Sequence, residues 1–291
     1  MSELTVHVVI LDFREAGATI RCAEGVLRQK GIGLRVIIVE NDAEGANFYR
    51  IKEHFAQSDR VFVLSSGENL GYARGNNYGV EWCREQHLDS DYTVIVNNDI
   101  DIPDDDTLAD LIREYEKFAD AGVVSPRIVH FGSGITQGPY REKTFGRYLL
   151  EACFPLAIPL RIGKEQRELA AIDRTIPVYR TMGSFMLIRT GLFEAVGLFD
   201  PRTFLGSEED ILSYRLRAAG KRFYYAPQHR VWHESGKSSK KLASKKVKNY
   251  FRDSTLYFWK EYKGAGTFRL FVLKHCINLY NFYQRTKNRI G

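Results

Sequence analysis

The 291-residue sequence has no uninterrupted apolar run of about 18 residues, the length that a membrane-spanning helix requires. It opens with "MSELTVHVVILDF", which leads directly into a predicted strand and lacks the pattern of a signal peptide. We therefore expect a protein that is made and kept in the cytoplasm.

Paired cysteines are also lacking. The four cysteines, Cys22, Cys83, Cys153 and Cys276, are scattered and form no CxxC pair. This spacing argues against a zinc site or a disulfide framework and suits a reducing compartment. The chain also has no internal repeat and no low-complexity linker, and its length suits one large domain or one domain with an appendage.

The common phosphate-binding spacings GxxxxGK[ST] and GxGxxG are absent. The chain instead contains "GENLGYARGNNYG", whose glycines permit a close backbone approach and whose polar side chains include Asn69 and Arg74. This stretch predicts a glycine-rich binding loop that belongs to neither of these two phosphate-binding motifs.

Strand and helix signals alternate along the first half of the chain. Apolar runs predict strands at 6–13, 34–42, 60–66 and 92–99, and amphipathic stretches predict helices at 17–29 and 71–86. This rhythm is typical of an α/β fold with a parallel sheet flanked by helices. Further on, the pattern predicts a helix at 104–119 and a strand at 122–130. A strand and short helix follow within 181–200, and then an acid-started helix and a strand within 207–227. The stretch 132–176 is weakly patterned and is interpreted as a lid or part of an acceptor site.

Three predicted strands end in polar residues, which are Asp12, residues 40–42 and residues 97–99. Ligands of open α/β sheets bind at the carboxyl ends of the strands. One polar strand end also fits a simple turn, but three that converge on one edge predict a cleft.

Asp99 at such a strand end is an oxygen ligand suited to Mg²⁺ or Mn²⁺. Asp101 follows two residues later and is a second candidate ligand. His233, in "VWHESG", adds a nitrogen ligand that favours Mn²⁺ over Mg²⁺. A lone histidine is more often structural, but the Gly-Ser-rich text after it indicates an exposed turn.

Seven motifs in order resemble family 2 glycosyltransferases, and in particular the bacterial rhamnosyltransferase-like branch that builds cell-surface polysaccharides. They are "VVILDF", "VIIVEND", "ENLGYARGNNYG", "VIVNNDI", "GSFMLIRTGLFEAVGLFDPRTF", "EEDILSYRLRAAGKRFYYAP" and "VWHESG". The match covers about residues 5–236, which gives a predicted transferase domain at 1–236 and a C-terminal extension at 237–291. The resemblance implies a GT-A fold, a Rossmann-like mixed and mostly parallel sheet. It also implies a nucleotide-diphosphate sugar donor, a divalent metal and inversion at the anomeric carbon.

Carried over by position, the resemblance places Asp12 and Phe13, with Glu40 and Asn41, around the nucleotide base. The family usually has aspartate at the position of Glu40, so this chain has a longer side chain there. Dependence on UDP or dTDP, and the sugar carried (rhamnose or a hexose), stay open.

The same resemblance assigns the diphosphate and the metal. Arg74 would approach the phosphates, Asn69 would shape that loop, and Asn98 would lie among the donor-binding residues. Asp99 matches the last carboxylate of the family's DxD-type motif, whose first position is Asn97 here. The metal therefore has one charged ligand fewer than a full DxD motif supplies. His233 matches a position that often approaches the metal or the diphosphate.

The catalytic base is expected in "SEED", because inverting transfer needs a carboxylate that removes the proton of the acceptor hydroxyl. Alignment on the downstream arginine places the family's Glu-Asp pair at Glu208 and Glu209, whereas alignment on the letters places it at Glu209 and Asp210. We favour Asp210, with Glu209 as the alternative. The plain structural explanation is that these acids favour a helix N-terminus. Gly183 and Ser184 match a turn beside the donor sugar and acceptor.

The C-terminal stretch combines lysines with aromatic residues and predicts two helices that are apolar on a broad face and basic elsewhere. "KSSKKLASKKVK" (237–248) carries six lysines and no acid. Two interpretations stay open: the helices pack on the body of the protein, or they lie on the inner face of the cytoplasmic membrane. A homodimer contact is a further use of the aromatic residues.

The main hypothesis is thus an inverting transferase with a lipid-linked or glycan acceptor. One rival is a nucleic-acid-binding protein, which the concentration of positive charge after residue 236 disfavours. Another is a nucleotidyltransferase, which usually has a glycine- and lysine-rich phosphate loop near the first strand, whereas "LDFREAGAT" at this place contains no lysine. A third rival is a glycosyltransferase-like scaffold without activity.

Overall fold

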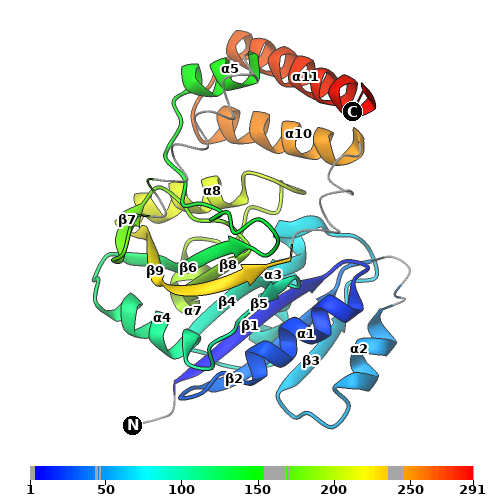
Figure 1. Cartoon of the computed structure of the whole chain (residues 1–291), viewed down its shortest axis with the longest axis vertical. Coiled ribbons are helices and arrows are strands. Elements are labelled where there is room, and N and C mark those ends of the chain that lie inside the picture. The colour runs from blue at the N-terminus through cyan, green and yellow to red at the C-terminus, as the bar shows by residue number, and fades with distance from the viewer. Residues whose placement is uncertain are drawn as a thin grey trace.

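A computed structural model of the chain describes residues 4–42, 45, 47–153, 168, 171–234 and 245–290. Figure 1 shows a central sheet with helices on both faces and, at one end, a separate layer formed by α5, α10 and α11. In the described ranges the sheet has nine strands in the order β3-β2-β1-β4-β8-β6-β9-β5, with β7 paired to β9.

The first half of the chain forms the parallel part of the sheet, as the sequence predicted. The strands are β1 (Thr5–Asp12), β2 (Gly33–Glu40), β3 (Val61–Ser65) and β4 (Tyr92–Asn97). The helices are α1 (Ala16–Leu27), α2 (Phe48–His54) and α3 (Gly71–Glu85). All but α2 were predicted, and α2 was missed because it has only seven residues.

The second half turns the sheet into a mixed one. β8 (Phe185–Arg189) runs antiparallel to β4 and to β6 (Ala121–His130), and β6 runs parallel to β9 (Arg222–His233). Two short strands that the sequence did not indicate, β5 (Ile100–Asp101) and β7 (Ile176–Val178), pair antiparallel with β9. The helices of this half are α4 (Thr107–Glu116), α7 (Thr190–Ala195) and α8 (Glu208–Ala218).

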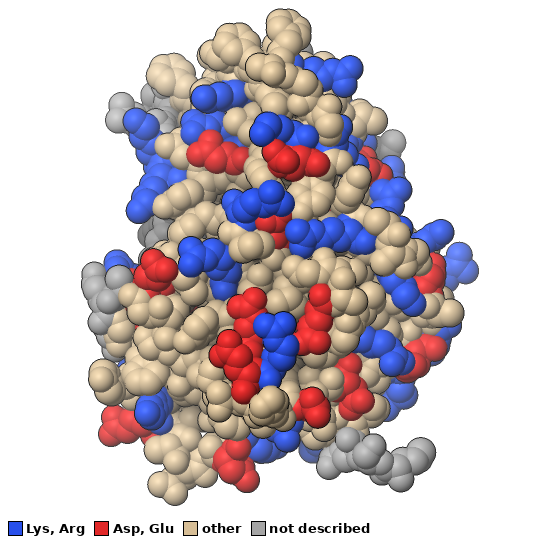
Figure 2. Space-filling model, turned by 180° about the vertical axis from the view of Figure 1, so that it is seen from behind, with Lys and Arg blue, Asp and Glu red and all other residues tan. Residues whose placement is uncertain are grey.

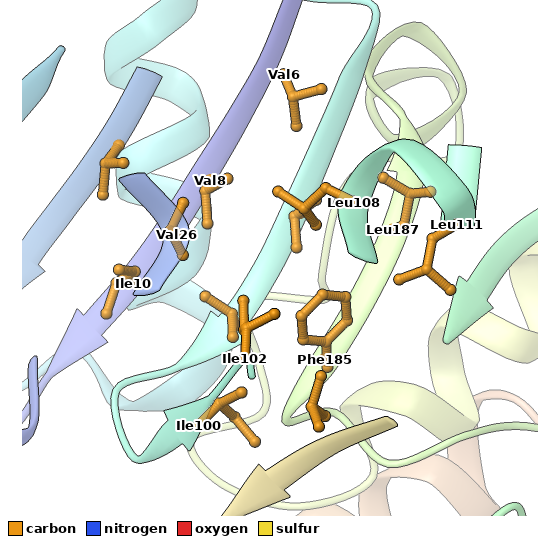
Figure 3. Packing of buried hydrophobic residues seen from close by; sticks show 14 of the residues in the cluster. Val6, Val8, Ile10, Val26, Ile100, Ile102, Leu108, Leu111, Phe185 and Leu187 are labelled. Atoms are coloured by element: carbon orange, nitrogen blue, oxygen red, sulfur yellow. The ribbon is translucent and has the colours of Figure 1, made fainter. Parts of the chain in front are cut away.

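The alternation of side chains along β1 supplies two separate cores. Val6, Val8 and Ile10 face one side, where they join Val26 of α1 and residues of α4 (Figure 3), while Val9 belongs to the cluster on the other side. Each fully buried side chain of this kind contributes roughly 1.5–3 kcal/mol by leaving water. Burial on both faces explains why these strands are continuous apolar runs.

The weakly patterned stretch 132–176 contains α5 (Phe145–Cys153) and leads into β7; residues 154–167, 169 and 170 lie outside the described ranges. Helix α5 packs against the C-terminal helices rather than on the sheet, as Figure 1 also shows. Its Cys153 places a sulfur 2.8 Å from that of Cys276, a proximity that the cysteine spacing did not indicate.

The two predicted C-terminal helices are present as α10 (Lys245–Glu261) and α11 (Thr267–Ile290). They share a hydrophobic cluster with the rest of the protein, in which Phe258, Trp259 and Leu273 pack with Ile211 of α8. At least one face of these helices therefore packs on the body. Most of the lysine-rich run and the predicted boundary at residue 236 lie outside the described residues, so that boundary stays a prediction.

Asp200 connects this helical layer to the body through buried polar contacts. It is fully buried and accepts hydrogen bonds from the Tyr257 hydroxyl (2.8 Å) and the Tyr262 hydroxyl (2.5 Å), and Arg202 and Arg215 lie within ion-pair distance. Burial alone would raise the pKa of Asp200, but the hydrogen bonds from Arg202 and Tyr262 outweigh it and hold that pKa well below its usual range. Asp200 thus stabilises the docking of α10 as an ionised carboxylate.

Replacing Asp200 by asparagine should lower the free energy of unfolding by about 3 kcal/mol, because Arg202, Arg215 and the two tyrosine hydroxyls lose the buried carboxylate that they contact. Since the folded-state pKa is depressed, the contribution of Asp200 is full at neutral pH. It disappears below about pH 4, as the pH falls through the folded-state pKa. Urea unfolding at several pH values measures both effects, with the exposed Asp253→Asn as the matched control. Equal midpoints for the native chain and Asp200→Asn at neutral pH would contradict this account.

Candidate active site

The predicted convergence of polar strand ends is confirmed. In the register of the sheet Asp12 lies opposite Glu40, and Leu11 lies opposite Asn97. Three adjacent parallel strands therefore end in polar residues at one edge, which is the position expected of a ligand site.

Asp12 is buried beneath this edge and accepts hydrogen bonds from several side chains. It accepts hydrogen bonds from the Thr19 hydroxyl (2.5 Å), the Asn47 amide (2.9 Å) and, at 3.4 Å, the Asn98 amide. Asp12 and Asn98 are thus brought together as predicted positions of one site. Phe13, which follows Asp12, lies with its ring 5.4 Å from the guanidinium carbon of Arg14.

Glu40 and Asn41 lie at the end of β2, and their side chains make different contacts. Glu40 is buried, and its Oε1 has no hydrogen-bond partner among the described residues. Burial raises its pKa, which a hydrogen bond from Ser65 only partly offsets. Asn41 instead supports the glycine-rich loop, since its Oδ1 accepts from the Leu70 amide (2.8 Å) and its Nδ2 donates to the Gly71 carbonyl (3.1 Å).

The glycine-rich loop turns into α3 at Gly71. Asn69 accepts the Gly71 amide at 3.0 Å, and Gly71 has a φ of 76° with no room for a β-carbon, which would lie 2.3 Å from the Phe204 carbonyl. Asn69 therefore shapes the loop as expected. Arg74 lies in the first turn of α3, where its half-exposed side chain is 3.5 Å from Glu68.

Asp99 and His233 meet across two strands. The antiparallel pairing of β5 with β9 places Ile100 opposite His233, and the Asp99 carboxylate lies 3.0 Å from His233 Nε2. The other ring nitrogen, Nδ1, is 2.5 Å from the side-chain oxygen of Gln137. Both side chains of the pair are largely buried.

This pair fits a divalent metal. Neighbouring ligands of an octahedral ion lie about 3.0 Å apart when each bond is about 2.1 Å, which is the separation found here. Gln137 holds the imidazole by its far nitrogen, as partners of metal-binding histidines usually do. Asp101 is exposed and does not join them, and in the described residues no three His, Cys, Asp or Glu side chains form a metal-binding group. A metal here would need oxygen atoms from a substrate or from water.

Gly183 and Ser184 lie between the strand ends and α8. The Ser184 carbonyl accepts the Asn97 amide at 3.0 Å, which attaches this turn to the end of β4. On its other side the Gly183 amide donates to Glu209 Oε1 at 2.9 Å, and the Gly183 carbonyl accepts the Tyr72 hydroxyl at 2.6 Å. A β-carbon on Gly183 would lie 2.5 Å from that carboxylate oxygen, so only glycine leaves the carboxylate in place.

The acids of "SEED" point to three different environments. Glu209 reaches the Gly183 turn, whereas Asp210 accepts a hydrogen bond from Arg180 at 3.0 Å, and Arg180 lies 4.1 Å from the centre of the Tyr140 ring. Glu208 is buried with its Oε1 lacking a partner in the described part, and burial together with the charge of Glu209 raises its pKa to about 8. The geometry therefore brings Glu209 to the predicted turn and does not bring Asp210 there.

Sequence reasoning missed Gln137, Tyr72 and Arg180. Gln137 comes from the weakly patterned stretch, where no periodicity marked any residue. Tyr72 stood within the quoted glycine-rich motif, and its aromatic ring among glycines was the one available signal.

Comparison with known proteins identifies related chains. Residues 7–197 match the model of "Glycosyl transferase family 2". The chain is 26% identical over 225 residues to rhamnosyltransferase WbbL of Escherichia coli K12, covering 76% of this chain and 81% of WbbL. It is 28% identical over 163 residues to the low-salt glycan biosynthesis hexosyltransferase Agl10 of Haloferax volcanii, covering 55% of this chain but only 47% of Agl10.

Solved structures resemble the chain in fold. A structure of GalNAc-T7 with UDP, GalNAc and Mn²⁺ superposes with a TM-score of 0.61 at 16% identity, covering 90% of this chain and 49% of GalNAc-T7. The mannosyltransferase PcManGT of Pyrobaculum calidifontis, in complex with GDP-Man and Mn²⁺, gives 0.57 at 15% identity, covering 93% and 68%. The expected fold class, an α/β GT-A fold, is confirmed. Because the family model matches more than half of the chain, the protein belongs to glycosyl transferase family 2 and is a glycosyltransferase of the rhamnosyltransferase-like type.

Proposed function

We propose that the protein transfers a sugar, with inversion, from a nucleotide diphosphate to a hydroxyl group of a lipid-linked or glycan acceptor in cell-surface polysaccharide synthesis. The observation that carries the proposal is the position of the Gly183–Ser184 turn, bonded to the β4 strand end on one side and to the Glu209 carboxylate on the other. Rhamnosyltransferase and hexosyltransferase relatives support dTDP-rhamnose or a UDP-hexose as donor.

In this proposal Asp99 and His233 hold Mn²⁺ or Mg²⁺, and Gln137 fixes the imidazole so that Nε2 faces the ion. A bound divalent ion supplies charge neutralisation for the departing diphosphate. Two solved relatives contain Mn²⁺, which supports this assignment. The carboxylate Asp101 lies outside the pair, so we assign it no direct ligand role.

The donor-binding residues follow the strand ends. Glu40 keeps a buried carboxylate oxygen without a partner, which suits the N–H of a uracil or thymine ring. Asp12, Asn41 and Asn69 hold the loops around the nucleotide base through hydrogen bonds. Phe13 and Arg74 have exposed side-chain surface, which we assign to contact with the base and with the diphosphate, respectively.

Glu209 is the residue that we propose as the base, in place of Asp210. Its Oε1 is held by the Gly183 amide, and a carboxylate held there removes the acceptor proton while the acceptor oxygen attacks the anomeric carbon. Asp210 instead accepts a hydrogen bond from Arg180 and does not reach the Gly183 turn.

Replacing Glu209 by glutamine should lower turnover by about 10²–10⁴-fold, because the base is lost while the hydrogen bond from Gly183 is kept. The assay measures nucleoside diphosphate released from UDP-hexoses and dTDP-rhamnose with Mn²⁺ and a membrane-lipid extract as acceptor. Asp210→Asn is the matched variant and should retain far more turnover. If Asp210→Asn alone abolishes release, the base is Asp210. If the native chain releases no nucleoside diphosphate from any of these donors, the proposed function is wrong.

Glu208 gives the enzyme a pH-dependent stability. Its folded-state pKa of about 8 exceeds the ordinary value near 4.5, so between these values the folded chain binds more protons than the unfolded chain. The free energy of unfolding should therefore fall as pH rises through this window, by up to a few kcal/mol. Urea midpoints measured from about pH 5 to about pH 8 should fall less steeply for Glu208→Gln than for the native chain. The same slope in both proteins would show that Glu208 does not titrate in this range.

Helix α11 carries the exposed apolar surface that is suited to contact with a membrane. Phe268 and Leu279 are three helical turns apart, as are Phe271 and Phe282, so these four exposed side chains share one face. Leu273 is buried on the opposite side. Figure 2 shows lysine and arginine side chains spread over the upper part of the molecule, where this helical layer lies. In the described ranges, none of the helices combines the length and apolar character needed to cross a bilayer. We propose that α11 instead rests on an anionic membrane surface, where a lipid-linked acceptor would be found.

The double variant Phe268→Ser, Phe271→Ser should lose most of its co-sedimentation with phosphatidylglycerol vesicles, because two aromatic anchors are removed. Tyr49→Ser, which changes an equally exposed ring on α2, is the control and should bind as the native chain does. No vesicle binding by the native chain would refute the membrane proposal. If the molecular mass in solution rises with concentration for the native chain and for Tyr49→Ser, and stays lower for the double variant, this face is a homodimer contact.

A further inference from the structure

Tyr72, the second residue of α3, reaches from the glycine-rich loop to the turn that holds the proposed base. Its hydroxyl donates to the Gly183 carbonyl at 2.6 Å, while the Gly183 amide donates to Glu209 Oε1 at 2.9 Å. A β-carbon on Gly183 would lie 3.1 Å from the Tyr72 hydroxyl oxygen and 2.5 Å from that carboxylate oxygen. The phenol and the carboxylate therefore flank the same glycine.

The position of the Tyr72 hydroxyl is fixed by contacts at both ends of the residue. Its backbone amide donates to the Phe204 carbonyl at 2.8 Å, and its ring packs edge-on against Phe199 with the ring centres 5.5 Å apart. Phe199 is itself attached to α3, because its backbone amide and carbonyl both bond to the side chain of Asn77. Phe199 and Phe204 belong to the segment that leads into α8, so α3 is also joined to the start of the helix that carries Glu209.

The Gly183–Ser184 turn has one anchor on each side. The Ser184 carbonyl accepts the Asn97 amide from β4, and the Tyr72 hydroxyl bonds to the Gly183 carbonyl from α3. Gly183 is buried, so without that hydroxyl its carbonyl would lose a donor that water does not readily replace. The turn would then be free to rotate its peptide groups, including the amide that holds the proposed base.

The Tyr72 hydroxyl is a permanent donor. Burial, and after it the nearby Glu209 carboxylate, raises the pKa of Tyr72 well above its usual range. The phenol therefore keeps its proton across the neutral range, and its hydrogen bond to the turn does not depend on pH there.

The same helical turn faces the proposed donor site. Arg74, which we assigned to the diphosphate, follows Tyr72 by two residues, and Gly71 immediately before it closes the glycine-rich loop. The loop on the donor side and the turn on the base side are thus connected through one side chain.

We propose that Tyr72 is a positioning residue for the transfer reaction: its hydroxyl fixes the Gly183 turn, and the turn in turn fixes the Glu209 carboxylate. The inference rests on the proposed function and adds the device that connects the donor-binding helix α3 to the base of that site. Tyr72 acts through Gly183 and needs no contact with the reacting atoms. Phenylalanine at this position would keep the ring packing on Phe199, so the role belongs to the hydroxyl.

The variant Tyr72→Phe removes only this hydroxyl. Its kcat should fall about 5- to 30-fold, because a base held in a less exact position removes the acceptor proton less efficiently. The donor KM and the affinity for UDP or dTDP with Mn²⁺ should stay within about twofold of the native values, since Arg74 and the metal pair are unchanged. Tyr78→Phe is the matched control, because Tyr78 lies on the same helix and also donates to a backbone carbonyl, that of Ser65. It should turn over as the native chain does.

Repeating Tyr72→Phe in the Glu209→Gln background separates positioning of the base from a general structural effect. Glutamine keeps the hydrogen bond from Gly183 but cannot accept the proton, so Tyr72→Phe should change the residual turnover less than about twofold there. An equal fold-loss in both backgrounds would overturn the inference, as would native kcat in Tyr72→Phe or a loss confined to the donor KM. These results leave the proposed function intact. Absence of nucleoside diphosphate release by the native chain with every donor would instead remove the proposed function, and the role of Tyr72 with it.

Discussion

The antiparallel pairing of β8 with β4 holds the two halves of the active site together. It inserts a strand from late in the chain beside β4, which in turn neighbours the parallel strands that carry Asp12 and Glu40. Next to this pairing the Ser184 carbonyl accepts the Asn97 amide. Because of this bond, the Gly183–Ser184 turn lies next to the strand end that precedes Asp99. The register of β8 on β4 therefore places the turn at the same edge of the sheet as Asp99.

The second half of the chain completes the site by hydrogen bonds between side chains and backbone. β9 delivers His233 to Asp99, and α8 delivers Glu209 to the Gly183 amide. The second contact depends on glycine at position 183, since a β-carbon there would lie 2.5 Å from Glu209 Oε1. Asp200 and the cluster around Trp259 then fix α10 against α8, so the helical layer supports the same helix that carries Glu209, the proposed base.

Much of this architecture could be predicted from the sequence. Strands β1, β2 and β4 are buried on both faces, so each appears as a continuous apolar run with a polar end, and their carboxyl ends meet as expected. The sequence interpretation favoured Asp210 over Glu209, but adjacent helical residues point about 100° apart, and only the tertiary contacts reveal that Glu209 reaches the turn. Gln137 could not be predicted as a site residue, because the stretch 132–176 has no clear hydrophobic periodicity. The C-terminal helices were ambiguous because packed and exposed aromatic residues look alike in a sequence, as Trp259 and Phe268 demonstrate.

The central claim is that the strand ends and the Asp99–His233 pair bind a metal-bound nucleotide diphosphate. Calorimetric titration of UDP, dTDP, GDP and CDP, each with and without Mn²⁺, tests it most directly when the native chain and Asp99→Ala are compared. The account predicts that UDP or dTDP binds the native chain much more tightly with Mn²⁺ than without, and that Asp99→Ala removes this gain. Equal affinity with and without Mn²⁺, or an unchanged gain in Asp99→Ala, would contradict it.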